Sequence, residues 1–429
     1  MNSLLIDFGA SRVKTAISDL SGGINYIKDY SPVTPSVFSE LKFEVPILEI
    51  KDLFYKIIKD YLKYDIKSVF ICSEQHGFAI KDINNNFITD YISWKDNRAF
   101  EKIDGLSTID FIKDKLPDFK KRTGMNIKAG IPSINLLHLM RLKILPKKIK
   151  ILTLPDILCG NKIHSTMLAG LGIWDIYKKE PYKDLFDLYK EMGYEISFNE
   201  PAYNICISET LNKNLSIYSG IGDNQCAIFG SYLNDKDVII NMGTGSQIAK
   251  IDELNTNAKM EQRPYFDNKN LSIITHIPSG RALNCFIGFI NDCFSYANSK
   301  LSAWNLLEEI TIKDIMESSM EFDLNVFESS YKFLMGGGGI RYIMEHNLNL
   351  KNYLSSLIKS YIEQYFAIID EYSIGYSKIV LAGGIPRKLN IIKKYIEEVK
   401  NINVFINEFE QDETLNGLKN IAILFGVYK

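Results

Sequence analysis

The sequence lacks closely spaced cysteines. Its six cysteines lie far apart and none belongs to a Cys-x-x-Cys pair, which argues against a zinc site or a disulfide framework. Most of them fall within apolar segments, such as SVFICS at 68–73. We therefore expect buried, reduced thiols.

The sequence also lacks an excess of charge of either sign and any long apolar run. Its 50 basic residues are balanced by 52 acidic residues without a block of like charge, so no surface for nucleic acid or anionic lipid is indicated. The opening segment MNSLLIDFGASRV contains Asp7 and no apolar stretch long enough for a signal peptide or a membrane span. We expect a cytoplasmic protein that acts on a small molecule and binds neither nucleic acid nor a membrane. The composition does not separate a monomer from a homodimer.

Several common catalytic motifs are missing. The sequence has no G-x-x-x-x-G-K-S/T P-loop, no G-x-G-x-x-G after a strand, no H-E-x-x-H and no G-x-S-x-G. P-loop NTPases, dinucleotide-binding enzymes, zinc metalloproteases and α/β-hydrolases therefore lose support.

The apolar pattern that is present predicts an α/β protein. Segments 2–8, 12–19 and 24–30 have strand character, whereas 51–63 places its apolar residues on one helical face and 68–73 is typical of a buried strand. Strand and helix therefore alternate. A chain of 429 residues exceeds what one core usually organises, so we expect two domains of roughly 200 residues each.

A similarity between the two halves of the chain supports two related domains. LLIDFGASRVKTAI at 4–17 aligns with VIINMGTGSQIAKI at 238–251, so that Gly9 meets Gly243. The second half then continues with a predicted helix at 352–370, the strand SKIVLAGG, a helix around KLNIIKKYIEEVK, the strand NVFINE and a final helix near ETLNGLKNIAILF. We place the boundary near 216–220.

The first glycine turn has the composition of a phosphate-binding loop. Asp7, Gly9, Ser11 and Lys14 form D-x-G-x-S-x-x-K between two strands, where free backbone N–H groups can hold phosphate oxygens and Asp7 can hold magnesium through water. An ordinary hairpin whose aspartate satisfies its own turn explains the same residues.

Two further glycine pairs lie in the second half. Gly243-Thr244-Gly245 suits the approach of a phosphate, but it also suits any sharp turn. Gly383 and Gly384 follow an apolar strand and precede a helix, so the backbone there can lie flat against a nucleoside or simply make a tight connection.

Asp223 follows a short apolar strand and precedes the small-residue segment CAIFGSYL, which places it near a helix N-terminus. Aspartate often caps helices, so capping is one interpretation. The other is a catalytic base, because phosphoryl transfer to an alcohol requires a group that accepts the hydroxyl proton.

Amide, imidazole, indole and carboxylate side chains come together around a second predicted strand end. Gln75 and His76 follow the strand 68–73, and Trp94 and Asp96 follow in YISWKDNRA. Such groups can read the hydroxyls of a sugar, with the indole face against its C–H groups. A structural histidine and a core aromatic residue are the ordinary alternatives for His76 and Trp94.

Taken in order, these motifs resemble the FGGY carbohydrate kinases of the actin/hexokinase/heat-shock ATPase superfamily. The resemblance rests on IDFGASRVK, SEQHG with ISWKDNRA, GIGDNQCAIFGS, NMGTGSQIA and LAGGIPRK, together with TG at 123–124 and RPYF at 263–266. The matching segments run from residue 4 to about 420 and cover essentially the whole chain.

The resemblance implies an α/β fold of two ribonuclease-H-like (actin-like ATPase) domains flanking a central cleft. Residues 1–218 would form the N-terminal, sugar-binding domain and residues 219–429 the C-terminal, nucleotide-binding domain. The implied activity is ATP-dependent and magnesium-dependent phosphoryl transfer to an alcohol group of a small sugar or polyol, with domain closure excluding water.

The resemblance also implies roles for individual residues. Asp223 takes the position of the base and touches the substrate. The substrate would further be read by Gln75, His76, Trp94 and Asp96. The Mg–ATP would be held by Asp7 (through water), Gly9, Ser11, Lys14, Gly243, Thr244, Gly245, Gly383 and Gly384.

The chain departs from the family pattern in two places. Ala10 replaces the usual threonine after the first hairpin glycine, so a hydroxyl contact passes to Ser11 or is lost. The G-T-R or G-E-R segment of the family is replaced by FLMGGGGIRYI, whose four glycines at 336–339 predict a flexible connection and leave its role open.

The pair GDNQ and GTGSQ is most similar to the sedoheptulokinase-like branch, which favours a ketose such as sedoheptulose phosphorylated at a terminal hydroxyl. Xylulose, ribulose, gluconate and glycerol are alternative substrates. The alternative from another functional class is a non-catalytic, sugar-binding regulator with the same fold. An ATPase or acyl-phosphate kinase would lack the QHG and WKDNRA segments.

Overall fold

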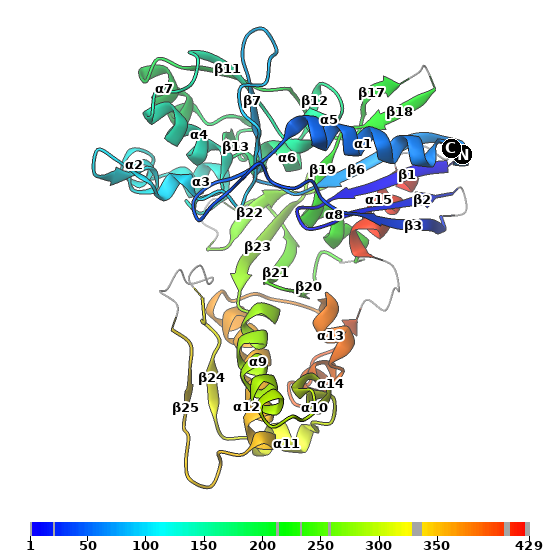
Figure 1. Cartoon of the computed structure of the whole chain (residues 1–429), viewed down its shortest axis with the longest axis vertical. Helices are drawn as coiled ribbons and strands as arrows, with labels where there is room; N and C mark the ends of the chain where they lie inside the picture. Colours follow the sequence, from blue (N-terminus) through cyan, green and yellow to red (C-terminus); the bar gives the residue numbers. More distant parts are fainter. Residues whose placement is uncertain are drawn as a thin grey trace. The chain divides into compact units, whose positions relative to one another are not determined.

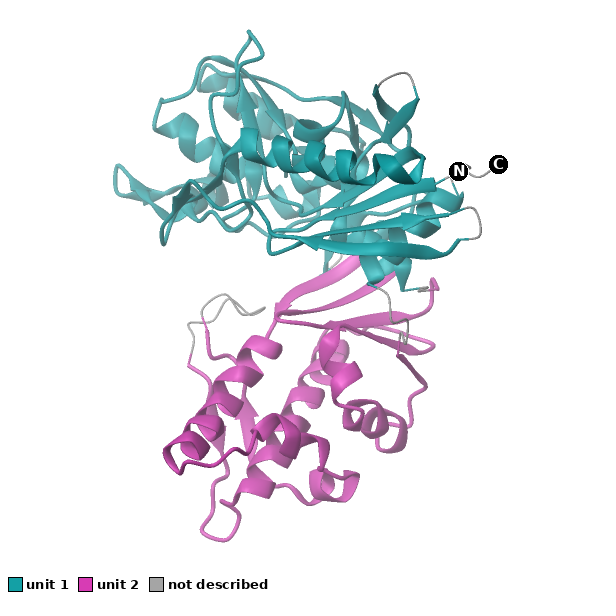
Figure 2. Cartoon of the chain, turned by 45° about the vertical axis from the view of Figure 1, so that its right-hand side comes forward, with its two compact units in different colours: residues 1–232, 253–270, 410–429 teal, residues 233–252, 271–409 magenta. Residues whose placement is uncertain are grey.

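The computed structural model describes seven stretches of the chain, residues 2–19, 22–211, 214–231, 234–255, 259–327, 337–406 and 412–424. Its contacts define two compact units. Unit 1 comprises residues 1–232, 253–270 and 410–429, and unit 2 comprises residues 233–252 and 271–409 (Figure 2). The last segment belongs to unit 1 because the final helix packs against the strand with which the chain begins, and the division into domains at 218/219 stays a prediction.

The central sheet of unit 1 has the strand order β17-β18-β6-β1-β2-β3. These strands are β1 (Asn2–Phe8), β2 (Val13–Ser18), β3 (Ile24–Tyr30), β6 (Ile66–Ser73), β17 (Ile207–Leu211) and β18 (Leu215–Tyr218). Strand β1 pairs with β2 in antiparallel and with β6 in parallel orientation. The strands predicted at 2–8, 12–19, 24–30 and 68–73 are confirmed.

The two faces of this sheet are covered by different helices. Helix α1 (Ile47–Tyr61) lies along one face of the sheet (Figure 1). It buries Phe54 and Ile57 in one core with Leu4 and Ile6 of β1, which confirms the predicted amphipathic helix. Successive strand residues point to opposite faces, so Asp7 lies on the other face. There the final helix, α15 (Glu413–Leu424), packs against β1 and β6.

A second core of unit 1 lies around helix α4 (Pro132–Arg141), which buries apolar residues on nearly all sides. This core continues into a small sheet of order β15-β11-β7, formed by β7 (Ala79–Lys81), β11 (Lys148–Leu152) and β15 (Glu195–Ser197). Further helices around it are α2 (Thr108–Lys115), α3 (Phe119–Thr123), α6 (Ser165–Gly170) and α7 (Lys183–Glu191).

Unit 2 is built on the strand order β23-β21-β20-β26-β27. The strands are β20 (Val238–Met242), β21 (Ser246–Asp252), β23 (Asn270–Ile277), β26 (Ile379–Ala382) and β27 (Val404–Ile406). The predicted helix at 352–370 is confirmed as α12 (Leu350–Glu371), whose Tyr353 hydroxyl donates to the Phe286 carbonyl of α9 (Gly280–Tyr296) over 3.5 Å. The predicted helix before β27 is α14 (Ile391–Glu398).

The two sheets share one topology. In unit 2, β20 pairs with β21 in antiparallel and with β26 in parallel orientation, as β1 does with β2 and β6 in unit 1. Gly9 and Gly243 each begin the turn of the corresponding hairpin. The internal similarity seen in the sequence is therefore a repeat of structure.

Two expectations require correction or remain partly open. Cys285 and Cys293 are exposed, because they lie on the outer side of α9, whereas Cys72, Cys159 and Cys226 are buried as expected. Gly336 lies outside the described residues, and the glycine run ends at β25 (Gly339–Arg341), which pairs with β24 (Glu321–Asp323). Among the described residues, no helix combines the length and apolarity needed to cross a membrane.

Helix α8 (Asp223–Gly230) crosses α15 at two glycines that permit very close approach. A Cβ atom on Gly417 would lie 2.0 Å from the Cys226 carbonyl oxygen, and one on Gly230 would lie 2.0 Å from the Glu413 carbonyl oxygen. This crossing holds the first residues of both helices on the Asp7 face of the sheet.

We predict that Gly417→Ala destabilises the protein by about 3 kcal/mol, because α15 must move away from α8 to accommodate the methyl group. Chemical denaturation measures this change. Gly288→Ala is the matched control in helix α9, where no atom lies within 4 Å of the new Cβ. That control should be neutral or stabilising by up to about 1 kcal/mol, through helix propensity alone. Equal effects of the two substitutions would contradict the close crossing.

Candidate active site

Asp223 is the first residue of helix α8. Strand β19 (Ile221–Gly222) pairs with Cys72 and Ser73 at the end of β6, which fixes where the helix begins. The N-cap residue is Gly222, so Asp223 is not the cap. Its Oδ1 accepts a 2.7 Å hydrogen bond from the Asn224 backbone N–H, and no other described group bonds to its carboxylate. One carboxylate oxygen therefore stays available as an acceptor.

The environment of Asp223 makes its carboxylate a stronger base than usual. Protein atoms surround the side chain although part of it still reaches solvent. Burial, followed by the negative charge of Asp7, raises the pKa of Asp223 to about 7. A carboxylate with this pKa can accept a proton near neutral pH.

Asp7 belongs to a cluster in which one lysine lies between two carboxylates. The Lys14 Nζ atom is 3.1 Å from Asp7 Oδ2 and 2.6 Å from Asp412 Oδ2. The Thr414 hydroxyl donates to Asp7 Oδ2 over 2.7 Å. Burial of the ammonium is outweighed by the two carboxylates, so the pKa of Lys14 is raised. Burial likewise opposes ionisation of Asp412, but Lys14 lowers the pKa of that carboxyl below its usual range.

The sequence did not reveal Asp412 and Thr414 as site residues. They lie at the start of the predicted last helix, where acidic and hydroxyl residues are common for helix-capping reasons alone. The Thr414 hydrogen bond to Asp7 spans 407 positions and the Asp412 ion pair with Lys14 spans 398, and both depend on α15 returning to β1. The only signal available was the polar D-E-T before a helix of small and apolar residues.

Gln75 and His76 are both held in unit 1 by their side chains. Gln75 Nε2 donates to the Thr166 carbonyl over 2.9 Å, and Gln75 Oε1 accepts from Arg263 over 3.2 Å. The His76 Nδ1 atom lies 2.8 Å from the Gly170 carbonyl, which can only accept, so Nδ1 carries the proton.

The Nε2 atom of His76 is buried without a hydrogen-bond partner among the described residues. Burial, with Arg263 as the next cause, lowers the pKa of His76 to about 3, so the ring is neutral at physiological pH. Nε2 is therefore a bare acceptor. A buried acceptor of this kind requires a donor, and a substrate hydroxyl would supply one.

Arg263 connects this acceptor region to a buried ion-pair network that the sequence only hinted at. Arg263 Nη2 lies 3.0 Å from Glu261 Oε2, and Lys128 Nζ lies 3.7 Å from Glu261 Oε1. Burial opposes ionisation of Glu261, but Lys128 and Arg263 outweigh it and lower the pKa of Glu261 to about 2. The RPYF segment marked this region in the sequence without giving Arg263 a role.

Trp94 and Asp96 have contrasting environments. The Trp94 side chain is 43% exposed, so its ring can still meet a ligand. Asp96 is fully buried and forms a 2.7 Å ion pair with Arg98. Its other oxygen accepts from the Phe43 backbone N–H over 2.8 Å. These internal partners of Asp96 fix the segment that carries Trp94. A contact between Asp96 and the substrate stays a prediction.

The turn between β1 and β2 exposes Ser11, whereas Gly9 is partly buried. A Cβ atom on Gly9 would lie 3.0 Å from the Arg12 carbonyl oxygen, which is tight for any larger residue. The turn is thus compact, and its outer residues remain accessible to a phosphate.

The corresponding turn of unit 2 is similarly open. Thr244 and Gly245 are exposed, and the Gly243 N–H donates to the Gly245 carbonyl over 3.2 Å. The Gly243 and Thr244 carbonyls accept from the first two N–H groups of α9, at 3.0 and 2.9 Å. These bonds hold the turn against the start of the helix.

Gly383 and Gly384 serve different needs. Gly383 has φ of 93°, and a Cβ atom there would lie 2.5 Å from the Met242 carbonyl oxygen, so the fold itself requires glycine. Gly384 begins α13 (Gly384–Lys388) and has no atom within 4 Å of its Cβ position. Its free face is therefore the one that a nucleotide could approach.

The predicted site residues thus form groups within each unit. Unit 1 carries Asp7, Gly9, Ser11, Lys14, Gln75, His76, Trp94, Asp96 and Asp223. Unit 2 carries Gly243, Thr244, Gly245, Gly383 and Gly384.

Solved structures match this fold, although no protein-family model and no curated protein matches the sequence. The xylulose kinase of Lactobacillus acidophilus aligns with a TM-score of 0.83 and 16% identity over 99% of this chain and 90% of that one. The gluconate kinase of the same organism aligns with a TM-score of 0.80 and 15% identity, covering 99% and 89%. Glycerol kinase from Plasmodium falciparum with ADP aligns with a TM-score of 0.79 and 15% identity, covering 100% and 90%.

These alignments establish the fold. The chain has the mixed α/β, two-domain fold of the actin-like ATPases, in the form found in sugar and polyol kinases. The fold class expected from the sequence is confirmed.

We predict that Asp223→Asn stabilises the fold at neutral and alkaline pH. The folded pKa of about 7 lies above the ordinary value of about 3.9, so folded Asp223 retains a proton that the unfolded chain releases, and stability falls between about pH 4 and pH 7. Asparagine keeps the acceptor for Asn224 without the charge. At pH 8 the free energy of unfolding should rise by roughly 1–3 kcal/mol, after allowance for the partial solvent access of Asp223. At pH 4 the variant and the wild type should differ little.

Urea denaturation at both pH values measures the effect. Asp114→Asn, at an exposed acid on α2, should leave stability unchanged at either pH. A variant that is less stable than the wild type at pH 8 would show instead that the ionised Asp223 supports the fold.

Proposed function

We propose that the protein is an ATP-dependent carbohydrate kinase that transfers the γ-phosphoryl group to a hydroxyl of a small sugar or polyol. The observation that carries this proposal is the Asp223 carboxylate, on the face of the sheet that also bears Asp7, with a pKa of about 7 and one oxygen that no described residue bonds. The fold shared with sugar and polyol kinases supports the same assignment.

Asp223 acts as the base in this proposal. Its free oxygen accepts the proton of the attacking hydroxyl as the oxygen–phosphorus bond forms and ADP leaves. A base whose pKa lies near the operating pH is sufficiently ionised while still binding a proton well. The low polarity and the nearby Asp7 charge that raise the pKa thus adapt an ordinary aspartate to this task.

The acceptor sugar is held by the unpartnered groups of unit 1. His76 Nε2 accepts a hydrogen bond from a sugar hydroxyl, and the Trp94 ring packs on C–H groups. Gln75 is oriented by Thr166 and Arg263, and Asp96 fixes the segment that carries Trp94. A site with several oriented polar groups discriminates strongly among hydroxyl patterns.

The acidic cluster of unit 1 fits a magnesium ion that arrives with the nucleotide. The donor set is suitable because Asp7 and Asp412 present hard carboxylate oxygens, and Mg²⁺ is typically held by one or two carboxylates together with waters and phosphates. Asp7 would hold the ion through water. Magnesium supplies neutralisation of the charge on the transferring phosphoryl group, and Lys14 adds its ammonium charge.

The nucleotide is held by the glycine turns. The backbone at Gly9 and Ser11, and at Thr244 and Gly245, can donate N–H groups to phosphate oxygens, while the Gly243 N–H holds the second turn through its bond to Gly245. Gly384, with Gly383 behind it, leaves a flat surface for the adenosine.

Within this class we propose a ketose such as sedoheptulose as the substrate, phosphorylated at a terminal hydroxyl. Support comes from the resemblance of GDNQ and GTGSQ to the sedoheptulokinase-like branch. The named neighbours act on xylulose, gluconate and glycerol, so these compounds are the principal alternatives. The proposed location is the cytoplasm, and a homodimer is as compatible with the proposal as a monomer.

The proposed function predicts ATP-dependent and magnesium-dependent phosphorylation of one member of a panel of ketoses, aldoses and polyols. Coupled ADP release identifies the substrate, and NMR of the product identifies the phosphorylated carbon. Asp223→Asn should lower kcat at least 1,000-fold (about 4 kcal/mol in activation free energy) while ATP affinity changes by less than about threefold. Asp114→Asn is the control with unchanged kinetics. Sugar phosphorylation by Asp223→Asn at the wild-type rate would overturn the role of the base, and sugar binding without turnover in the wild type would favour the regulator.

The raised pKa of Asp223 predicts the pH dependence of the reaction. Since the base must be ionised, kcat/KM for the sugar should fall as pH decreases below about 7 and level off above it. Asp7→Asn removes the neighbouring negative charge, so it should move this acid limb to lower pH as well as reduce the rate. Measurement at saturating Mg–ATP between pH 5 and 9 tests both statements. An acid limb at the same pH in both proteins would exclude Asp7 as a cause of the shift.

A further inference from the structure

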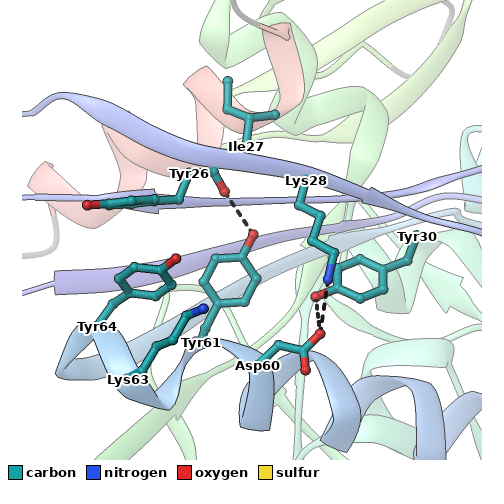
Figure 3. A pocket seen from close by; sticks show the side chains of 8 residues that line it. All are labelled: Tyr26, Ile27, Lys28, Tyr30, Asp60, Tyr61, Lys63 and Tyr64. Atoms are coloured by element: carbon teal, nitrogen blue, oxygen red, sulfur yellow. Dashed lines mark hydrogen bonds and ion pairs between the residues drawn. The ribbon is translucent and has the colours of Figure 1, made fainter.

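A groove of about 440 Å³ lies on unit 1 beside the edge strand β3, at the end of α1 (Figure 3). The 3-10 helix η1 (Leu62–Tyr64) forms one side of it. Figure 3 shows that tyrosine side chains from β3 and from the α1–η1 segment meet across this groove, with lysine and aspartate side chains among them. The volume is within the range of small-molecule sites, which is about 300–1,000 Å³.

The shape of the groove depends on a β-bulge in β3. Thr15 pairs with Lys28 but Ile17 pairs with Asn25, so Tyr26 and Ile27 share the place of one residue. Tyr26 has φ of 53°, and its carbonyl accepts a 2.8 Å hydrogen bond from the Tyr61 hydroxyl.

The bulge presents an aromatic ring to solvent. Tyr26 is 60% exposed. The centres of the Tyr26 and Tyr64 rings are 4.3 Å apart, and the ring planes are inclined by 33°. A left-handed conformation is unfavourable for a bulky residue, and burial of the ring does not offset it here. Bulges often serve to direct a side chain at a functional site, so the geometry indicates a ligand for this surface.

The polar groups of the groove are partly unoccupied. Asp60 Oδ2 accepts from Lys28 Nζ at 3.1 Å and from the Tyr30 hydroxyl at 2.8 Å, whereas Asp60 Oδ1 has no partner in the part of the chain that the structure describes. The Lys63 ammonium lies 5.0 Å from the centre of the Tyr64 ring, and none of the described carboxylates pairs with it. One acceptor and one cation are therefore available.

This combination selects the chemistry of the ligand. Tyrosine faces offer apolar surface to the C–H groups of a sugar, and the free Asp60 oxygen can accept from its hydroxyls. Lys63 can bind one phosphate. The charges of Lys28, Lys63 and Asp60 sum to +1, which suits a monophosphate better than the di- or triphosphate of a nucleotide. In addition, the Tyr26 and Tyr64 rings contact each other and leave no slot for a base between them.

We propose that this groove, defined by Tyr26, Lys28, Asp60, Lys63 and Tyr64, is a second binding site, for a sugar phosphate. It is separate from the candidate active site, because adjacent residues of β2 serve the two places. Lys14 bonds to Asp7 on one face of the sheet, and the Thr15 hydroxyl lies 2.8 Å from that of Tyr61 beneath the groove on the other face. The site stands on its own geometry and does not depend on the proposed kinase activity.

Isothermal calorimetry with fructose 6-phosphate as the probe tests the proposal, with fructose, inorganic phosphate and ADP as comparison ligands. Tyr26→Gly removes the ring but tolerates the left-handed backbone, so the bulge survives. Lys63→Gln removes the free cation. Each variant should weaken fructose 6-phosphate binding at least tenfold at this site and leave the melting temperature and the ATP affinity unchanged.

Tyr55→Ala and Lys59→Gln are matched controls on exposed positions of α1 that do not line the groove, and both should bind as the wild type does. Binding that is insensitive to Tyr26→Gly and Lys63→Gln would overturn the proposal. The proposal would also be overturned if the protein bound ADP but not fructose 6-phosphate and the two substitutions weakened ADP binding. It would likewise be overturned if inorganic phosphate bound as tightly as the sugar phosphate. Failure of the kinase assay alone would leave this result intact.

Discussion

The ammonium of Lys14 lies between the carboxylates of Asp7 and Asp412, and much of unit 1 serves to place these three groups together. Asp7 and Lys14 are paired across the first hairpin, so their proximity is local. Asp412 comes from the far end of the chain and arrives only because α15 packs on β1 and crosses α8 at Gly230 and Gly417. Two partly buried carboxylates without a cation between them would repel each other, so the ion pairs and the helix crossing depend on one another.

The negative charge of Asp7 affects both the ion-pair cluster and Asp223. Asp7 is stabilised by Lys14 and Thr414, whereas Asp223 has a single hydrogen bond and no ion pair among the described residues. The field of Asp7 consequently raises the pKa of Asp223 in addition to burial. The two aspartates thus have different partners: Asp7 bonds to a cation and a hydroxyl, whereas Asp223 keeps an oxygen available for proton transfer.

The sequence predicted the elements and the repeat well because these depend on local patterns. The strands at 2–8 and 24–30 and the helix at 352–370 follow from apolar spacing, and the alignment of Gly9 with Gly243 reflects a hairpin chemistry that each half needs separately. The cysteines were expected to be buried because most of them fall within apolar segments, but Cys285 and Cys293 are exposed on α9, where helix geometry decides burial.

What the sequence could not provide were contacts between distant segments. Asp412 and Thr414 look like ordinary helix-start residues, and the buried Arg263–Glu261–Lys128 network joins segments more than a hundred positions apart. The unpartnered Nε2 of His76 and the bulge at Tyr26 are likewise invisible without coordinates, because each is defined by what surrounds it. Residue type identified candidates, and only three-dimensional packing distinguished Asp96, with its internal partners, from His76, with its free acceptor.

The return of α15 to unit 1 also has a consequence for how the protein is made. On the ribosome, residues 1–232 emerge first but lack the helix that covers one face of their sheet until residues 271–409 have been synthesised. The nascent first unit therefore lacks α15 on one face of its sheet and has an incomplete acidic cluster while unit 2 is translated, and apolar surface exposed in this way favours aggregation. Premature termination within unit 2 yields chains that lack Asp412 altogether, so translation must pass through the whole second unit before the cluster can form.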